Sequence, residues 1–228
     1  MNARHVVVRT IERAARSAVD GLAVLGTATV HEAIGRRGFA GPQLRPIQQG
    51  TRLAGTAVTV SSHPGDNLMI HAAVEVCQEG DVLVVTSTAP STHGVFGELL
   101  ASSLRARGVR ALVTDAGVRD TAELREMGFA VWSQHVSCQG TVKASPGSVN
   151  VPVVLGGHVV VSPGDVVCAD DDGVVVVARD EAAWALDRSR ERAAKEDGTR
   201  ARLAAGELGV DIYGLRAKLE ALGVEYVV

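Results

Sequence analysis

Two acidic residues and an arginine are spaced so that they could hold a metal ion beside an anionic substrate. Glu98 is followed, after twenty intervening residues, by the adjacent pair Arg119 and Asp120. Carboxylate oxygens are ligands that Mg²⁺ and Mn²⁺ prefer. A guanidinium stays protonated and binds a carboxylate through two parallel hydrogen bonds. Structural acids and surface ion pairs give the same spacing more often, so the elements that carry these residues decide between the two interpretations.

The stretch from Glu98 to Arg119 predicts a helix that returns to a strand. Apolar residues after Glu98 recur with a helical period, Gly108 ends the helix, and 110–114 is a short β-branched run. With Glu98 in the first turn of the helix and Arg119 and Asp120 just past the strand, the three side chains converge at one edge of a sheet. In open α/β sheets, ligands usually bind at this edge.

Composition describes an ordinary globular chain and excludes several classes of function. Of 228 residues, 46% are hydrophobic and 21% are charged, with a net charge of −3, so no basic surface indicates nucleic acid. The longest apolar runs, such as 174–178, are too short to cross a bilayer. The amino terminus lacks the long apolar core of a secretory signal. We therefore expect a cytoplasmic protein with no nucleic-acid or membrane partner.

The three cysteines, Cys77, Cys138 and Cys168, are odd in number and form no close pair. Neither a disulfide framework nor a Cys-x-x-Cys metal site is expected, and all three are predicted to be small, mostly buried thiols. Aromatic residues make up only 3% of the chain. Such a core depends on many small aliphatic contacts, and oligomerisation would bury more of them.

Hydrophobic periodicity and turn residues predict alternating helices and strands, followed by short strands and a helical tail. The predicted helices are 10–25, 29–35 (opened by a capping box at Thr29), 68–77, 98–107, 121–127, 180–206 and a last helix after 213. The predicted strands are 53–61, 82–85, 110–114, 129–133, 151–155, 158–161, 165–168 and 174–178.

Two further features precede predicted helices near the same edge. Asp66 is a natural N-cap for the helix at 68–77, and Asn67 either turns its amide toward the edge or satisfies the backbone of the turn. The long loop 86–97 carries glycines at 94 and 97, which would let backbone N–H groups approach an anion at a helix start. The loop matches neither a Walker motif nor a dinucleotide-binding fingerprint.

The carboxyl-terminal part differs from the rest. Hairpin turns are predicted at 156–157, 163–164 and 170–173, and the three aspartates at 170–172 are more typical of a turn than of a calcium loop. The helical tail after residue 180 has an apolar stripe and charged faces, which favours packing on another subunit. We therefore predict a catalytic α/β domain with amino-terminal helices, 1–179, and a helical extension at a subunit interface, 180–228.

Four ordered segments carry a resemblance to a known family. They are Gly65-Asp66-Asn67-Leu68 with His71-Ala72-Ala73, Gly94 to Leu100, Asp115 to Asp120, and Gly206 to Tyr213. Together they resemble the bacterial 4-hydroxy-4-methyl-2-oxoglutarate / 4-carboxy-4-hydroxy-2-oxoadipate aldolases over nearly the whole chain. The resemblance implies an α-β-β-α sandwich of the swivelling, phosphohistidine-like type, with C-terminal helices packing on a neighbouring subunit. It also implies homotrimers assembling as homohexamers, and a divalent metal, Mg²⁺ or Mn²⁺.

The resemblance implies an activity as well. Family members cleave these 2-oxo acids into pyruvate plus pyruvate or oxaloacetate, decarboxylate oxaloacetate, and serve protocatechuate and gallate degradation. Where the family commonly has an aspartate, this chain has Glu98. The implied roles are Asp120 as metal ligand; Glu98 and, from a neighbouring subunit, Glu196 (or Glu191) as holders of metal-bound water; Arg119 at the substrate; and Asn67, Gly97, Leu99 and Leu100 in the substrate pocket.

Two alternatives stay open. Aldol cleavage through a lysine Schiff base would need Lys143, since Lys195 and Lys218 lie in helices that the sequence predicts to be charged and exposed. A different class of function is a non-catalytic regulator that binds a ribonuclease, because the regulator of ribonuclease activity A shares this fold and resembles the aldolases through the Arg-Asp region. Those regulators are shorter and lack a tail like 180–228.

Overall fold

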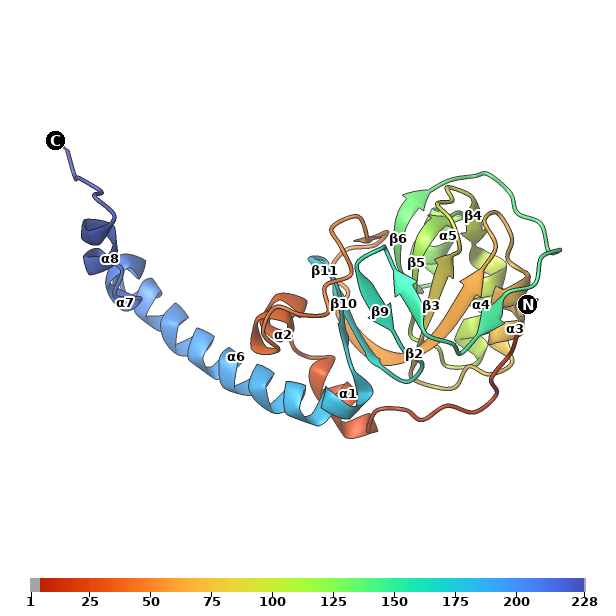
Figure 1. The fold of residues 1–228 in the computed structure, drawn as a ribbon, viewed down its shortest axis with the longest axis horizontal. Coiled ribbons are helices and arrows are strands. Elements are labelled where there is room, and N and C mark those ends of the chain that lie inside the picture. Colours follow the sequence, from red (N-terminus) through yellow and green to blue (C-terminus); the bar gives the residue numbers. More distant parts are fainter. Residues whose placement is uncertain (1–4, 228) are drawn as a thin grey trace. The chain divides into compact units, whose positions relative to one another are not determined.

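The computed structural model describes residues 5–227, and the chain divides into two compact units, Met1–Ser189 and Arg190–Val228 (Figure 1). The first unit is a mixed α/β domain, and the boundary falls within helix α6. The strands are β1 (Arg45–Pro46), β2 (Leu53–Ser62), β3 (Asp81–Ser87), β4 (Gly94–Phe96), β5 (Ala111–Val118), β6 (Ala130–Val136), β7 (Ser148–Val149), β8 (Val153–Leu155), β9 (Val159–Val161), β10 (Val166–Asp170) and β11 (Gly173–Val177). The helices are α1 (Arg16–Leu22), α2 (Thr27–Ala33), α3 (Leu68–Val74), α4 (Glu98–Ala106), α5 (Thr121–Glu126), the 3₁₀ turn η1 (Arg179–Glu181), α6 (Ala182–Ala204), α7 (Gly209–Ile212) and α8 (Arg216–Ala221).

One large sheet organises the first unit. Its strand order is β1-β6-β5-β3-β2-β10-β11, with β4 paired to β5 and β7 paired to β2. Strands β2, β3, β5 and β6 run parallel, and α3, α4 and α5 lie in the connections between them. Because parallel strands end at the same edge, the loops that follow β3 and β5 lie together at the carboxyl end of the sheet.

Strand alternation divides the core between the two faces of the sheet. On β5, Leu112 packs with α3, α4 and α5, whereas its neighbours Ala111 and Val113 face the small β8–β9 sheet. A third cluster joins α1, α2 and the start of α6 to β10 and β11. These buried side chains are mostly Val, Leu and Ala, as the low aromatic content predicts.

Most of the central elements confirm the predicted pattern, including β2, β3, α4, β5 and the position of Arg119 after a strand. The mixed α/β class is therefore confirmed. The swivelling sandwich and the packing of the C-terminal helices on a neighbouring subunit stay predictions. No helix among the described residues is long and apolar enough to cross a membrane.

Several local predictions are wrong because tertiary contacts override local preference. The helix predicted at 10–25 is only α1, since Arg13 forms an ion pair with Asp81 and Ala14 N–H donates to Gly164. The Thr29 capping box does not form, because α2 begins at Thr27 after Gly26 and has no side-chain cap.

Two further corrections concern a turn and a thiol. The turn at 163–164 is not a hairpin, because β9 pairs only with β8 whereas β10 joins the large sheet. Turns at 156–157 and 170–173 do connect antiparallel pairs. Cys77 and Cys168 are buried as predicted, but Cys138 is exposed because it lies in a surface segment after β6.

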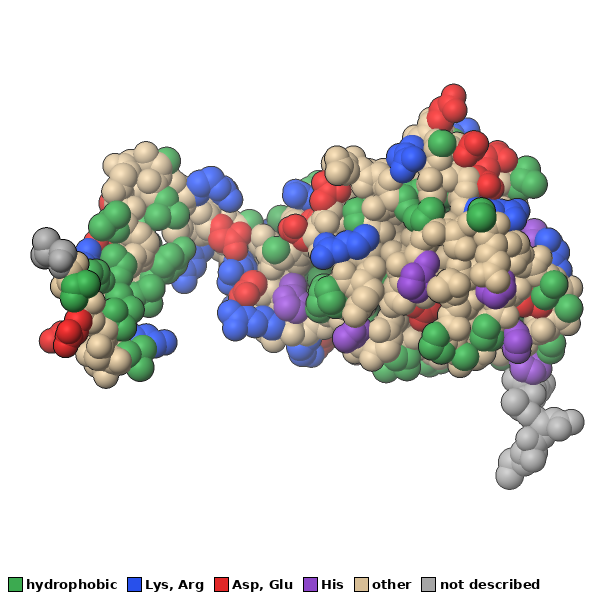
Figure 2. Space-filling view, turned by 90° about the horizontal axis from the view of Figure 1, so that it is seen from above, with side chains coloured by type: hydrophobic (Ala, Val, Ile, Leu, Met, Phe, Trp, Pro, Cys, Tyr) green, Lys and Arg blue, Asp and Glu red, His purple; other side chains and the backbone are tan. Residues whose placement is uncertain are grey.

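The second unit is helical and has no buried residue among those described, 190–227. Figure 2 shows hydrophobic side chains gathered on its surface. The large exposed apolar residues of this unit are Leu203, Leu208, Tyr213, Leu215, Leu222, Val224, Tyr226 and Val227. Such a patch on a polar helical segment is typical of a surface that packs against another protein chain.

Candidate active site at the carboxyl end of β5

Arg119 and Asp120 form the tight turn between β5 and α5. The Arg119 N–H donates to the Phe96 carbonyl oxygen on β4 at 2.9 Å. Asp120 has φ 54° and ψ 41°, the left-handed conformation. This conformation costs a non-glycine residue about 1–2 kcal/mol and persists where surrounding contacts hold the residue, often at functional sites.

Gly97 provides the space that the Asp120 carboxylate occupies. Asp120 Oδ2 accepts a hydrogen bond from the Glu98 N–H at 3.2 Å. A Cβ added at Gly97 would lie 2.2 Å from that same oxygen. The backbone of Gly97 is extended, with φ −159°, so glycine is needed here for close approach and not for its conformational freedom.

Glu98 begins α4, as its place in the sequence predicts. Its backbone amide contacts Asp120, whereas its carboxylate Oε1 accepts a hydrogen bond from the Ser102 hydroxyl at 2.8 Å. A carboxylate at this end of a helix is favoured by the helix dipole. The structure thus brings Glu98 and Asp120 to the same edge, with the Glu98 carboxylate directed along its own helix.

The Arg119 side chain is available at the surface of this edge. Its Nε lies 3.6 Å from Asp120 Oδ2, and the two side chains are 44% and 39% exposed. At that distance and exposure the pair contributes little to stability. A half-exposed guanidinium beside a half-exposed carboxylate leaves both groups free to bind a ligand.

Asn67, at the start of α3, bonds the backbone of a distant strand and not that of its own turn. Its Nδ2 donates to the Val95 carbonyl oxygen at 3.1 Å, so the amide does satisfy backbone and ties α3 to β4. Its Oδ1 is buried and has no hydrogen-bond partner among the described residues. A buried acceptor without a donor is uncommon and calls for an explanation such as a ligand or an ordered water.

Leu99 and Leu100 differ in what their side chains do. The Leu99 side chain is 80% exposed beside the site, whereas Leu100 is buried in the core under α4. Only the backbone of Leu100 is therefore placed to contact a ligand. The first amides of α4 have no acceptor within the helix, and such N–H groups suit a carboxylate.

A segment that the sequence did not single out holds these elements together. We call this segment, residues 137–145, the strap. Its Ser137 N–H donates a hydrogen bond to the Val118 carbonyl oxygen at 2.9 Å. Its Gln139 carbonyl oxygen accepts a hydrogen bond from the Gly94 N–H, also at 2.9 Å. A Cβ at Gly94 would lie 2.4 Å from the Ser137 carbonyl oxygen. In the sequence, Gly94 was the only sign that another segment of the chain passes this close to β4.

Asp66 fixes the other end of the strap. It is fully buried, and it is not the predicted N-cap, since Asn67 holds that position without a side-chain cap. Asp66 instead accepts three backbone N–H bonds, from Leu68 at 2.8 Å and from Ala144 and Ser145 at 2.8 and 2.6 Å. Burial raises the pKa of this carboxyl, but the backbone hydrogen bonds outweigh it and hold the pKa below its usual value.

Glu196 and Glu191 belong to the second unit and are described there alone. The Glu196 Oε1 lies 2.7 Å from the Arg192 Nε, one turn earlier on α6. Glu196 also lines a cavity of ≈ 350 Å³ within that unit, together with Lys195 and Tyr213. Its predicted role in the site of a neighbouring subunit stays a prediction.

The donor set at the edge suits a hard divalent cation that keeps much of its water. Asp120 and Glu98 offer carboxylate oxygens at this edge. Among residues 5–227, no group of three or more His, Cys, Asp or Glu side chains converges to enclose an ion. Mg²⁺ commonly binds through one or two carboxylates plus waters, so the residues present fit it better than they fit Zn²⁺.

The fold is an α/β fold, and acidic side chains and an arginine lie together at the carboxyl end of its sheet. Comparison with known families shows which protein family has this fold. The chain belongs to the RraA-like family, described as Aldolase/RraA, which matches residues 27–176. The matched region includes Asn67, Glu98, Arg119 and Asp120.

Individual relatives carry two kinds of name. A protein of Halalkalibacterium halodurans named "Putative 4-hydroxy-4-methyl-2-oxoglutarate aldolase" is 26% identical over 179 residues, covering 78% of this chain and 82% of the relative. A Burkholderia multivorans protein of the same name is 37% identical over 138 residues, covering 60% of this chain and 82% of the relative. The crystal structure of Streptomyces coelicolor RraAS2, described as an unusual member of the RNase ES inhibitor RraA protein family, has a TM-score of 0.73 at 29% identity and covers 83% of this chain and 100% of that one.

Proposed function

We propose that this protein is a divalent-metal-dependent pyruvate aldolase. Its substrates are 4-hydroxy-4-methyl-2-oxoglutarate, 4-carboxy-4-hydroxy-2-oxoadipate or both, which it cleaves to pyruvate plus pyruvate or oxaloacetate, and it decarboxylates oxaloacetate as a side activity. One observation carries the proposal: Asp120, in a strained turn, is seated against the Glu98 amide in the space left by Gly97, with the Arg119 guanidinium beside it. The names of two relatives support the same reaction.

Mg²⁺ or Mn²⁺ is the proposed cofactor, with Asp120 as its ligand and Glu98 acting through water. Bound beside the 2-oxo acid, the cation would withdraw electron density from the keto oxygen. Arg119 binds a carboxylate of the substrate and adds positive charge where the enolate develops. Asn67 and the first amides of α4 are the groups proposed to orient the substrate.

The reaction requires two proton movements. The hydroxyl on C4 loses its proton as the C3–C4 bond breaks, which leaves a carbonyl on C4 and an enolate on C2 and C3. A proton then returns to C3 and gives the methyl group of pyruvate. Glu98 and, from a neighbouring subunit, Glu196 are the proposed groups that move these protons. Loss of CO₂ from oxaloacetate forms the same enolate, so one site suffices for both activities.

Self-association completes this proposal. The second unit exposes a large apolar patch and contains Glu196, so we propose that it packs on a neighbouring subunit of a homotrimer or homohexamer. We also propose that the first unit is the swivelling type of α-β-β-α sandwich. The protein is expected to act in the cytoplasm.

A second candidate function is supported by the likeness to RraAS2, whose description names a ribonuclease inhibitor family. In that case the surface around Arg119 would bind a ribonuclease and no 2-oxo acid would be turned over. The two functions make opposite predictions for catalysis, so one assay distinguishes them.

The test is pyruvate release from both substrates by metal-free protein, with and without added Mg²⁺ or Mn²⁺. We expect turnover only with metal, and loss of turnover in EDTA. Borohydride treatment with pyruvate should leave no adduct; a covalent adduct at Lys143 would replace the metal mechanism with a Schiff base. Tight binding to a ribonuclease without any turnover of 2-oxo acids would favour the regulator.

A further inference from the structure

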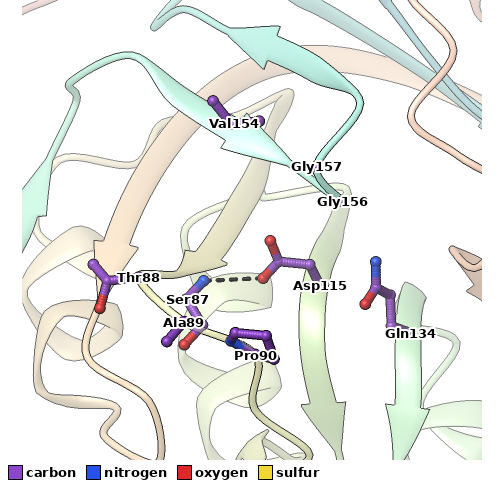
Figure 3. A pocket seen from close by; sticks show the side chains of 9 residues that line it. All are labelled: Ser87, Thr88, Ala89, Pro90, Asp115, Gln134, Val154, Gly156 and Gly157. Atoms are coloured by element: carbon purple, nitrogen blue, oxygen red, sulfur yellow. Dashed lines mark hydrogen bonds between the residues drawn. The ribbon is translucent and has the colours of Figure 1, made fainter.

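A cavity in the first unit lies where the β8–β9 turn meets the loop after β3 and the neighbouring strands β5 and β6. It has a volume of ≈ 390 Å³, against about 30 Å³ for one liquid water molecule. Its lining residues are Ser87, Thr88, Ala89, Pro90, Asp115, Gln134, Val154, Gly156 and Gly157 (Figure 3). None of them belongs to the proposed aldolase site, so any ligand bound here has a role beyond the proposed function.

A β-bulge aims polar side chains at this cavity. Thr114 pairs with Ser133 and Gly117 with His135, so Asp115 and Ala116 together oppose the single residue Gln134. Figure 3 shows Asp115 and Gln134 projecting side by side from β5 and β6. Bulges redirect side chains and are frequent beside binding sites.

Asp115 is a carboxylate with backbone partners and no cationic partner among the described residues. Its Oδ1 accepts the Ser87 N–H at 2.9 Å, and the Gly156 N–H also donates to it. Burial raises the pKa of Asp115 above its usual value, against the lowering effect of these hydrogen bonds. The described residues that line the cavity include no Arg, Lys or His. An acid kept in such surroundings is unfavourable unless a positive group compensates it.

A second polar side chain, Gln134, projects beside the carboxylate (Figure 3). Its Nε2 lies 3.4 Å from the position of a Cβ added at Gly156. A Cβ at Gly156 would lie 2.6 Å from the Ala40 carbonyl oxygen, so only glycine lets the β8–β9 turn approach this closely. Gly157, with φ 75°, has nothing within 4 Å of an added Cβ, which leaves the mouth of the cavity open.

From this geometry we infer a binding site for a small primary amine in its ammonium form. An ammonium group carries N–H donors and a positive charge, which suit the Asp115 carboxylate and the carbonyl oxygen of the neighbouring Gln134 amide. A hydrogen bond between an ammonium and a carboxylate is charge-assisted and stronger than a neutral one. Anionic ligands, including 2-oxo acids, are disfavoured because, among the described residues that line the cavity, the one charged side chain is an acid.

The test compares ethanolamine with ethylene glycol, which replaces the ammonium by a hydroxyl. Saturation-transfer NMR titrations of the full-length protein at pH 7.5 and constant ionic strength should give saturable binding of ethanolamine that is about 10-fold tighter than that of ethylene glycol. Asp115→Asn should weaken ethanolamine about 10-fold, because the amide keeps the Ser87 bond but loses the charge. Asp187→Asn, an exposed acid on α6, is the matched control and should bind as wild type.

Gln134→Leu gives an independent test that does not touch the Ser87 bond, and it should weaken ethanolamine several-fold. Unchanged affinity in both variants would overturn the inference. Equal binding of ethylene glycol would identify a site for neutral polyols instead. Displacement of ethanolamine by Mg²⁺ that disappears in Asp115→Asn would identify an inorganic cation site. Because pyruvate release is measured separately, failure here leaves the proposed aldolase activity intact.

Discussion

The turn that carries Arg119 and Asp120 is fixed by backbone contacts, whereas the second unit, Arg190–Val228, has no buried residue among those described. In the turn, strand pairing and the close approach at Gly97 determine where the two side chains lie. In the second unit, exposed pairs such as Arg202 with Glu207, 2.6 Å apart, join successive helical segments. Exposed pairs of this kind contribute little to stability.

The difference indicates where each half of the proposed site obtains its order. The half on β5 and α4 is preorganised within one chain, which is the arrangement that favours catalysis. The half that contains Glu196 would gain its order only when the apolar patch of the second unit is covered. Substitutions in the first half should therefore act directly on turnover, whereas those in the second should act through assembly.

Asp120→Ala is the largest expected effect. Loss of the proposed metal ligand should lower kcat/KM for pyruvate release about 1,000-fold at any metal concentration. The protein should still fold, because the Asp120 carboxylate is 39% exposed. Asp187→Ala is the control. Near-wild-type rates in Asp120→Ala would remove Asp120 from the mechanism.

Arg119→Lys tests whether a positive charge alone is enough. Lysine keeps the charge but lacks the planar fork that binds a carboxylate through two hydrogen bonds, so turnover should fall about 100-fold. Steady-state kinetics should show a rise in KM and a fall in kcat. The same exchange at Arg105, an exposed residue on α4, should change neither. Full activity in Arg119→Lys would show that simple electrostatic attraction is sufficient.

Gly97→Ala tests the preorganisation itself without removing any polar group. The new Cβ would lie 2.2 Å from Asp120 Oδ2, so the carboxylate must move. A displacement of about 1 Å can reduce catalysis about 100-fold, and we expect a loss of that size with Mg²⁺ affinity reduced as well. Gly140→Ala is the matched control, since an added Cβ there meets nothing within 4 Å. Equal activity of the two variants would mean that Asp120 need not sit against the Glu98 amide.

Glu196→Gln extends the comparison to the second unit. If Glu196 acts on the site of a neighbouring subunit, its loss should lower kcat about 10- to 100-fold, while Glu191→Gln stays near wild type. Mixing inactive Asp120→Ala subunits with Glu196→Gln subunits should restore part of the activity, because some interfaces then contain both intact groups. The reverse ranking would assign the role to Glu191, and no recovery on mixing would place both groups in one subunit.

The sequence predicted the part of the site that depends on local order. Asp120 could be placed after a strand at the carboxyl end of the sheet from the sequence between Glu98 and Arg119. That sequence contains a helical pattern, a glycine that ends it and a β-branched run. Period and turn residues also identified β2, β3 and the β10–β11 hairpin. These elements form from contacts between residues near in sequence or from regular alternation.

What the sequence did not predict depends on contacts between distant segments. Strand β4 has only three residues, and it forms because β5 provides a partner, not because 94–96 has a strong pattern. The strap 137–145 has no period at all, and its position follows from hydrogen bonds to Asp66, Gly94 and Val118. The β-bulge at Asp115 left no signal in the sequence, since it appears only when β5 and β6 are paired.

Asp66→Asn should have the smallest effect, on stability and its pH dependence. Hydrogen bonds from three backbone N–H groups hold the pKa of Asp66 below its usual value, so its stabilising contribution is present above the unfolded pKa of about 3.9 and is lost as pH falls through the lower folded pKa. At pH 7 the variant should lose about 1–3 kcal/mol of unfolding free energy in urea titrations. The difference from wild type should shrink below about pH 4, because protonated Asp66 resembles the neutral amide. In the control Asp187→Asn, the unfolding free energy should not differ from wild type in a pH-dependent way. If Asp66→Asn loses the same unfolding free energy at every pH, the charge of Asp66 does not contribute to holding the strap.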